Sequence, residues 1–287
     1  MKIVRYGPAG HERPGCLDAD GQLRDLSALV RDIDANALSD EAIRRLAAAA
    51  PNAPRVEGTH RLGAPVANVG KFIAIGLNYS DHAAETGAAI PTEPIIFSKA
   101  TSCIVGPCDD IVLPPASTKT DWEIELGIVI GTRASHVERD LAIGHVAGYL
   151  AVNDVSEREY QLERGGTWDK GKGCDTFGPI GPWLVTRDEV PEPQALQMWL
   201  DVNGERRQRG NTRTMIFDCA TLVSYVSRFM TLMPGDIIAT GTPPGVGLGM
   251  KPQPVFLKHG DIVTLGIDGL GEQRQRVVSF ESTGAAR

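Results

Sequence analysis

The sequence has few cysteines, no excess of positive charge and no long apolar run. Its five cysteines are odd in number and mostly far apart, which argues against structural disulfides. No second Cys or His pair follows Cys103 and Cys108 to complete a zinc pattern. The 29 Lys and Arg residues are outnumbered by 36 Asp and Glu residues, so the electrostatic basis for general nucleic-acid binding is missing. No segment approaches the ~18 apolar residues of a membrane span, and the first ten residues lack the apolar core of a secretion signal. We therefore expect a cytoplasmic protein that binds neither nucleic acid nor a membrane.

Glycine and proline are abundant, with 32 and 19 residues, and this argues against a helical bundle. Before residue 65, the pattern predicts short strands and one helix over residues 39–50. Beyond it, helices are expected near residues 79–87, 137–144, 155–163 and 217–231. Strands are expected over residues 71–79, 94–99, 122–131, 145–154, 181–186, 198–204, 235–241 and 261–280. Because strands and helices do not alternate strictly, we expect an α+β, sheet-rich fold. Residues 51–70 are rich in Pro and Gly and lack periodicity, so we expect a domain boundary near residue 65, between a small N-terminal domain (1–65) and a larger domain (66–287).

Two glutamates stand two positions apart in the apolar segment of residues 122–131. Strand alternation places Glu123 and Glu125 on one face, opposite the apolar side chains. Two such acids repel each other and resist desolvation, and a shared divalent cation would offset both effects. The alternative is that both lie on the solvated face of an edge strand. Asp154 ends another apolar segment, where it either joins the same site or caps the following helix. Hard carboxylate oxygens favour Mg²⁺, Mn²⁺ or Ca²⁺ over Zn²⁺.

A histidine and a glutamate stand three positions apart just after the apolar segment 71–75. A helix that starts near Tyr79 would place His82 and Glu85 on one face, close enough to hydrogen-bond. A carboxylate beside an imidazole fixes its tautomer and raises its basicity, which suits a general base that activates water. The alternative is an ordinary surface pair.

Two Gly-rich stretches follow later in the chain. Residues 233–247 run from a strand into a Gly/Pro loop that has neither a P-loop nor a dinucleotide-binding fingerprint. A tight turn of this kind can still hold a carboxylate with its backbone N–H groups. Residues 168–179 form the other stretch, which contains Lys170 and Lys172. A lysine near a metal could bind a substrate carboxylate or stabilise a developing oxyanion, whereas most lysines only solubilise a surface.

Six segments of the chain occur in the order found in one family of enzymes. They are GLNYSDHAAE, PIIFSKATS, DWEIELGIVIG, GYLAVNDVSEREYQ, KGCDTFGPIGPW and PGDIIATGTPPGVG, and they cover roughly residues 70–270. On these motifs the sequence resembles the fumarylacetoacetate hydrolase family. The resemblance implies a mixed β-roll catalytic domain behind a small N-terminal α/β domain, and a homodimer or higher homo-oligomer.

The resemblance also assigns roles to particular residues. Glu123, Glu125 and Asp154 correspond to the family's metal-binding carboxylates, with Mg²⁺ as the expected cation and Mn²⁺ or Ca²⁺ as alternatives. His82 and Glu85 match its water-activating dyad, and Lys172 matches its catalytic lysine. Substrate-lining positions in relatives correspond to Lys99, Arg158, Gln161 and Thr242. Leu77 stands where many acylpyruvate-cleaving relatives carry Arg, which argues against a second acidic group at that end of the substrate.

The stretches NDVSEREYQLERGGTWDKG and WDKGKGCDTFGPIGPWLVT resemble most the branch that hydrolyses 2,4-diketo-3-deoxy sugar acids derived from L-rhamnonate or L-fuconate. We therefore expect a metal-dependent hydrolase that cleaves the C3–C4 bond of a 2,4-diketo acid into pyruvate and a small hydroxy acid such as lactate. Ureidoglycolate cleavage, oxaloacetate-type decarboxylation and enoyl isomerisation of a related acid are alternatives. A non-catalytic metal- or carboxylate-binding protein is the alternative of another class. The set of His82, Glu85 and Lys172 argues against it, because a binding protein needs no general base.

Overall fold

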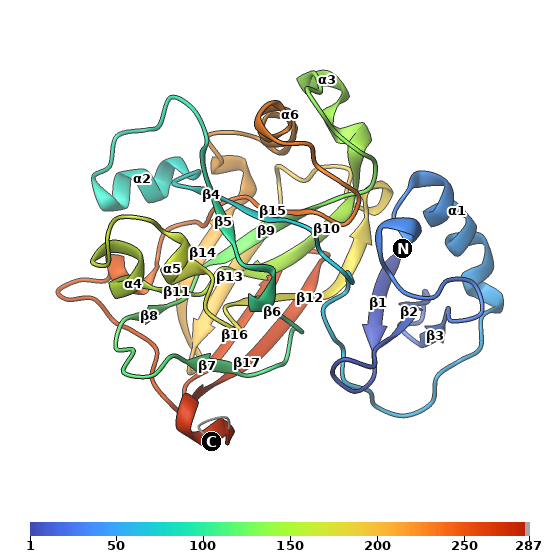
Figure 1. Ribbon diagram of the computed structural model, residues 1–287, viewed down its shortest axis with the longest axis horizontal. Helices are drawn as coiled ribbons and strands as arrows, with labels where there is room; N and C mark the ends of the chain where they lie inside the picture. The colour runs from blue at the N-terminus through green and yellow to red at the C-terminus, as the bar shows by residue number, and fades with distance from the viewer. Residues whose placement is uncertain (285–287) are drawn as a thin grey trace.

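The computed structural model describes residues 1–284 of the chain, apart from the side chain of Thr86. Most of the regular structure is strand, and the helices are short (Figure 1). The helices are α1 (Asp40–Ala49), α2 (Ser80–Thr86), α3 (Arg139–Ala142), α4 (Arg158–Leu162), α5 (Asp169–Lys172) and α6 (Cys219–Phe229). The strands are β1 (Lys2–Tyr6), β2 (Arg13–Leu17), β3 (Leu23–Asp25), β4 (Phe72–Gly76), β5 (Ile95–Lys99), β6 (Ile104–Val105), β7 (Ile111–Leu113), β8 (Thr120–Asp121), β9 (Ile124–Ile130), β10 (Val146–Asn153), β11 (Ser156–Glu157), β12 (Gly178–Thr186), β13 (Gln197–Val202), β14 (Glu205–Asn211), β15 (Ile237–Ala239), β16 (Ile262–Ile267) and β17 (Gly271–Ser279). The predicted α+β, sheet-rich fold is confirmed.

The larger sheet has the strand order β3-β2-β1-β12-β10-β9-β15-β4-β5, and β6 pairs with β12 outside this path. In this mixed sheet β4 and β15 are parallel, whereas β9 is antiparallel to both β10 and β15. All seven residues of β9 are buried. The hypothesis of a solvated edge strand is therefore wrong for Glu123 and Glu125, because β9 runs through the middle of the sheet and both glutamates lie buried at its start.

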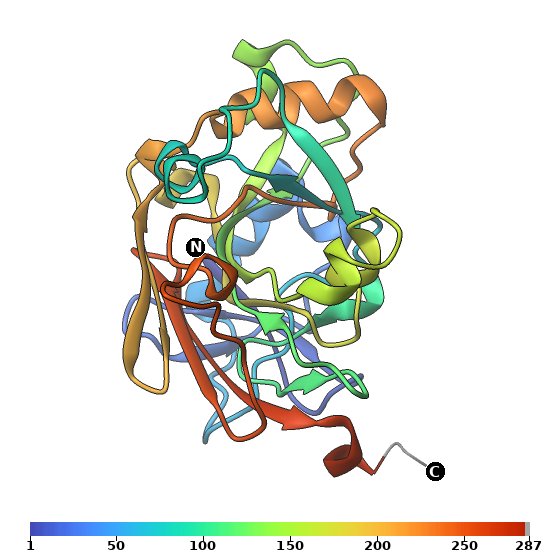
Figure 2. The same cartoon turned by 90° about the vertical axis from the view of Figure 1, so that its left-hand side faces the viewer.

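The second sheet has five strands in the order β14-β13-β16-β17-β7. It packs along β9, β10 and β12 of the larger sheet, and its gold and red strands lie together in Figure 2. Leu126 and Ile128 of β9 belong to the core, as do Leu200 of β13 and Leu265 of β16. α3 and α6 pack together at one end of the molecule.

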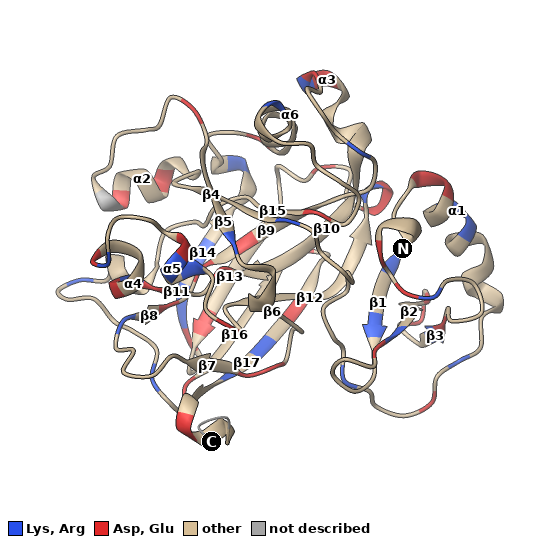
Figure 3. Cartoon of the chain, viewed as in Figure 1, with Lys and Arg blue, Asp and Glu red and all other residues tan. Residues whose placement is uncertain are grey.

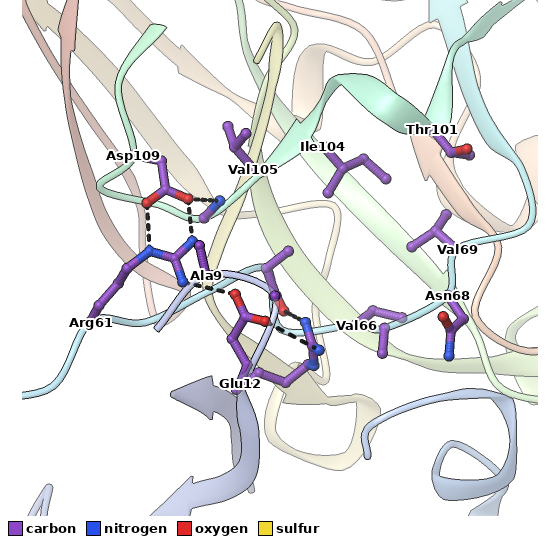
Figure 4. Close-up of a pocket in the computed structure, with 15 residues that line it drawn as sticks. Ala9, Glu12, Arg61, Val66, Asn68, Val69, Thr101, Ile104, Val105 and Asp109 are labelled. Atoms are coloured by element: carbon purple, nitrogen blue, oxygen red, sulfur yellow. Dashed lines mark hydrogen bonds and ion pairs between the residues drawn. The ribbon is translucent and has the colours of Figure 1, made fainter. Parts of the chain in front are cut away.

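The N-terminal strands extend the larger sheet, because β1 pairs antiparallel with β12. Asp109 also ties residues 1–65 to the rest of the chain, accepting hydrogen bonds of 2.7 and 2.5 Å from the guanidinium of Arg61. The same guanidinium donates to Glu12 at 2.8 Å, and these residues border a cavity of about 460 Å³ (Figure 4). The domain boundary near residue 65 stays a prediction.

Local capping explains where two helices begin. The hydroxyl of Ser39 accepts a hydrogen bond from the N–H of Ala42, so α1 starts as predicted. The helix expected over residues 155–163 is shorter, since α4 begins at Arg158 and is capped by Glu157. The hypothesis that Asp154 caps this helix is therefore wrong. The strands β6, β7, β8 and β14 and the helix α5 have no counterpart among the predicted elements, and β11 lies where a helix was expected.

Charged residues of both signs are spread over most elements in the view of Figure 3. This agrees with the small formal net charge of −7. Within residues 1–284, no helix has the length and apolar character needed to cross a membrane.

Candidate active site

Three carboxylates meet beneath one cavity. Glu123 and Glu125 come from the start of β9, and Asp154 follows β10, which is the antiparallel neighbour of β9. Each offers an oxygen within 4.8 Å of the oxygens of the other two, and all three side chains are buried. The pairing of Glu125 with Val152 in the β9–β10 register places the ends of both strands at the same edge. The pairing of β9 with β10 therefore brings three acids that are distant in the sequence into one cluster.

Two lysines and an arginine surround these carboxylates. Lys172 Nζ donates to Glu123 and to Asp154, both at 2.7 Å. Lys99 Nζ lies 2.6 Å from Asp154 Oδ1 in an ion pair, and within residues 1–284 no group donates a hydrogen bond to Oδ1. Arg158 donates to Glu123 at 2.6 Å and to Asp121 at 2.8 Å.

The surroundings shift the pKa values of the two glutamates in opposite directions. Burial alone would raise the pKa of Glu123, but Lys172 and Arg158 outweigh it and lower the pKa to about 2. The pKa of Glu125 is raised well above its ordinary value by burial and by the negative charges of Asp154 and Glu123. The Glu125 carboxylate accepts a hydrogen bond of 2.8 Å from the N–H of Gly241.

The cluster fits a divalent cation. With Glu125 ionised, as a metal ligand must be, the four buried carboxylates of Asp121, Glu123, Glu125 and Asp154 face three cationic side chains, which leaves one negative charge for a cation to balance. An oxygen of Asp154 also has no hydrogen-bond donor. Carboxylate oxygens are the ligands that Mg²⁺ and Mn²⁺ prefer, so Glu123, Glu125 and Asp154 would hold such an ion.

The histidine and glutamate of α2 face the same cavity. His82 Nδ1 lies 3.0 Å from Glu85 Oε2, as their spacing predicts. The N–H of Gly245 donates to the same carboxylate, at 3.1 and 3.2 Å from its two oxygens. The Gly/Pro loop thus holds carboxylates with its N–H groups, as a tight turn can. In this structure they are the protein's own, those of Glu125, Glu85 and Asp121.

The cavity has a volume of about 600 Å³ and is lined by His82, Glu85, Glu123, Glu125, Arg158, Gln161, Lys172 and Thr242 together with a group of apolar side chains. Gln161 accepts a hydrogen bond of 2.9 Å from Arg158. Thr242 donates to the carbonyl of Ile124 at 2.8 Å. Lys99 and Asp154 lie below these residues and are not among those that line the cavity; Lys99 also donates to the carbonyl of Lys172. The roles of these residues in binding and catalysis stay predictions.

Several residues that shape the site are not among the predicted site residues. Asp121 accepts from Arg158 and from the N–H groups of Gly247 and Leu248, at 2.6 and 3.0 Å, and so joins the Gly/Pro loop to the cavity floor. Trp168 and Phe97 line the cavity with their rings 5.1 Å apart. The motif Asp-Trp-Glu marked the region of Asp121, but only the pairing of distant loops shows what its side chain contacts.

The arrangement combines the parts needed to bind and polarise a small oxygen-rich acid. A cation held by three carboxylates can bind vicinal oxygens, and a histidine backed by glutamate can deprotonate water. The buried ammonium of Lys172 carries positive charge to the same place. Burial alone would lower its pKa, but Asp154 and Glu123 raise it, so the side chain stays protonated.

Known proteins share this sequence and fold. Residues 71–278 match the fumarylacetoacetate (FAA) hydrolase C-terminal family. A protein of Burkholderia ambifaria strain MC40-6 that is named as a hydrolase, without a substrate, is 63% identical to this chain. The match covers 96% of this chain and 98% of that protein. The fumarylacetoacetate hydrolase of the psychrophile Exiguobacterium antarcticum has a TM-score of 0.85 at 38% identity, over 97% of this chain and 99% of its own. The maleylpyruvate hydrolase of Sphingobium sp. SYK-6, solved with manganese(II) and pyruvate, has a TM-score of 0.81 at 33% identity. The match covers 97% of this chain and 99% of that enzyme. The chain therefore belongs to the fumarylacetoacetate hydrolase family.

Proposed function

We propose that this protein is a divalent-metal-dependent hydrolase that cleaves the C3–C4 bond of a 2,4-diketo acid, of the 2,4-diketo-3-deoxy-L-rhamnonate or L-fuconate type. The products would be pyruvate and a small hydroxy acid such as lactate. One observation carries the proposal: His82 and Glu85 line the same cavity as the buried Glu123 and Glu125. A general base and a metal-ligating acid cluster are both needed for hydrolysis, whereas a binding protein needs no base.

A bound divalent cation would act as Lewis acid and template for the 1-carboxylate and 2-keto oxygens of the substrate. His82 donates its Nδ1–H to Glu85 and takes a proton from water on Nε2, while the water oxygen adds to the C4 carbonyl. The carboxylate of Glu85 stabilises the imidazolium that results, and Gly245 keeps that carboxylate in place.

Breaking the C3–C4 bond leaves the electron pair on C3 as the enolate of pyruvate. The acyl fragment leaves as the hydroxy acid, whose new carboxyl group carries the second proton of the water and releases it to solvent. Lys172, held as an ammonium between Glu123 and Asp154, offsets the negative charge that develops on this half of the substrate. His82 then returns its proton to C3, so one water is consumed and the residue regains its starting state.

The size of the cavity supports a substrate of six carbons. About 600 Å³ lies within the range of roughly 300–1,000 Å³ that is typical of small-molecule sites. The Sphingobium enzyme at 33% identity was solved with pyruvate, the product that this proposal expects here.

Pyruvate release from 2,4-diketo-3-deoxy-L-rhamnonate and from acetylpyruvate tests the proposal. Each substrate is given with Mg²⁺, with Mn²⁺ and with EDTA, and pyruvate is followed with lactate dehydrogenase. We expect release that requires the metal and is faster from the sugar acid. The absence of release from both acids, in protein whose metal content is verified, would contradict the proposal and favour ureidoglycolate cleavage, decarboxylation or isomerisation.

A further inference from the structure

One wall of the active-site cavity is apolar and takes no part in the proposed chemistry. It consists of Leu77, Ile95, Phe97, Leu162 and Trp168, and we call it the apolar wall. We propose that the apolar wall, with Trp168 as its specificity-determining residue, selects substrates whose acyl group ends in an uncharged alkyl group such as methyl, rather than in a second carboxylate. This inference rests on the proposed hydrolysis of 2,4-diketo acids.

Ile95 and Phe97 of the wall come from β5, and Leu77 follows β4, Leu162 ends α4 and Trp168 precedes α5. In the β4–β5 register, Gly76 pairs with Ile95 and Ala74 pairs with Phe97, so the two β5 side chains stand on one face. The ring of Trp168 packs edge-to-face on Phe97, with centroids 5.1 Å apart. A Cβ on Gly76 would lie 2.5 Å from the Trp168 ring, so glycine at this position leaves the space that the ring occupies.

The apolar wall begins at the reacting centre. Trp168 directly precedes α5, and its carbonyl accepts a hydrogen bond of 3.1 Å from the N–H of Lys172. Lys172 Nζ lies 5.3 Å from the centroid of the Phe97 ring and 2.7 Å from Glu123. A substrate with its keto-acid half near Glu123 would therefore place its acyl end along Phe97 and Trp168 on the way to the mouth of the cavity.

The cations of the cavity are poorly placed to receive a second carboxylate along this wall. Arg158 is already engaged by Asp121 and Glu123, and Lys172 by Glu123 and Asp154. Ile95 and Leu162 are exposed at the rim of the apolar wall, whereas Leu77, Phe97 and Trp168 are half-buried. A carboxylate packed against these three would lose part of its hydration without gaining a partner, whereas a methyl group gains from leaving water. Lys251 also lines the cavity, but it is exposed, and a charged acyl end that reaches it is the alternative that the experiment must distinguish.

The test compares two acids that differ only at the end of the acyl group. 2,4-Dioxoheptanoate ends in methyl and 2,4-dioxoheptanedioate ends in a carboxylate, and acetylpyruvate serves as a short reference that lacks the tail. With Mg²⁺ present, we expect kcat/KM for pyruvate release to be about tenfold or more higher for the methyl-ended acid, since one apolar group in such a pocket changes specificity by roughly 10–200-fold.

The variant Trp168→Ala should lower this preference about tenfold, mainly by raising KM for 2,4-dioxoheptanoate, and should affect acetylpyruvate less, because that acid lacks the tail that reaches the ring. Trp168→Phe should restore most of the preference. Trp199→Ala removes a half-buried tryptophan from β13, outside the cavity, and is the matched control that should change none of these ratios. If Trp168→Ala does not fold, Leu77→Asn replaces it. Leu77 has a φ of 48°, a region that Asn adopts readily, and a polar side chain there should lower the same preference.

The outcomes distinguish a failure of the apolar-wall inference from a failure of the proposed hydrolase function. Pyruvate release from all three acids with no preference, or with a preference for the dicarboxylate, would overturn the apolar-wall inference and leave the proposed hydrolase standing. A preference that survives both Trp168→Ala and Leu77→Asn would also overturn it. The absence of release from any acid would contradict the proposed function, and the inference would fall with it.

Discussion

The backbone N–H of Gly245 donates to both carboxylate oxygens of Glu85, at 3.1 and 3.2 Å, across a sequence separation of 160 residues. The same carboxylate lies 3.0 Å from Nδ1 of His82. The imidazole is therefore oriented by a tertiary contact as well as by the helix that carries it. We therefore expect the dyad to be rigid and the charge of Glu85 to be needed for turnover.

Glu85→Gln keeps the shape of the side chain and removes its charge. We expect kcat to fall about 10–100-fold, because the imidazolium loses its counter-charge, and KM to change little. Steady-state pyruvate release measures both constants. Glu41→Gln on the exposed side of α1 is the matched control. An unchanged kcat in Glu85→Gln would show that this carboxylate does not support the base.

His82→Asn removes the proposed base. Turnover should fall by about 10²–10⁴-fold, the usual contribution of a general base, while Mg²⁺ still raises the Tm as in the wild type. Pyruvate release and thermal unfolding on the same preparation check the two halves of this prediction. His11→Asn, at an exposed position, should behave as the wild type. Full activity of His82→Asn would remove the dyad from the mechanism.

Glu125→Gln should abolish the rise in Tm that Mg²⁺ or Mn²⁺ produces in the EDTA-treated wild type, because one of the three carboxylates is lost. Activity should fall with it. Glu57→Gln, the same substitution at an exposed position, should keep both the metal-induced rise in Tm and the activity. A full metal-induced shift in Glu125→Gln would place the ion elsewhere.

Glu125 also predicts how the metal-free protein responds to pH. Burial, Asp154 and Glu123 raise its pKa in the folded state above the ordinary 4.5. The stability that its protonated form contributes is therefore fully present below pH 4.5 and is lost as the pH rises through the raised pKa. Across this window, EDTA-treated wild type should lose free energy of unfolding relative to Glu125→Gln, which does not ionise. Urea unfolding at several pH values measures the difference, and parallel curves would count against it.

Arg61 and Asp109 predict a link between the N-terminal strands and the rest of the fold. Their two hydrogen bonds form a bidentate pair that is only partly exposed, with side-chain exposures of 30% and 23%. A double-mutant cycle of Arg61→Met and Asp109→Asn should give a coupling energy of about 1 kcal/mol, measured by urea unfolding. A coupling energy near zero would show that the pair does not contribute to the free energy of unfolding.

Local patterns predicted those parts of the site that lie close in the sequence. The alternation of residues 122–131 placed Glu123 and Glu125 together, and the spacing of His82 and Glu85 gave their hydrogen bond. The pattern allowed the glutamates a solvated edge strand, because no periodicity reveals that β9 lies between β10 and β15. For the same reason Asp154 remained an alternative helix cap until the pairing of β9 with β10 placed it beside Glu123.

Long-range contacts account for what the sequence left out. β14 escaped prediction because Glu205–Asn211 carries three arginines and no hydrophobic alternation; its pairing with β13 is a tertiary effect. The contacts of the Gly241 and Gly245 N–H groups with Glu125 and Glu85 depend on a loop that folds back over the sheet. The motif position of Lys99 predicted that it lines the substrate cavity. In the structure its ammonium is buried against Asp154, below the residues that line the cavity.

Hydrolysis of 2,4-diketo-3-deoxy-L-rhamnonate in H₂¹⁸O with Mg²⁺ tests the central claim most directly, because it follows the water that His82 is said to activate. The account predicts pyruvate and lactate in equal amounts, with ¹⁸O in the carboxylate of lactate and none in the carboxylate of pyruvate. Lactate without ¹⁸O in its carboxylate, or loss of CO₂ in place of lactate, would contradict attack of water on C4.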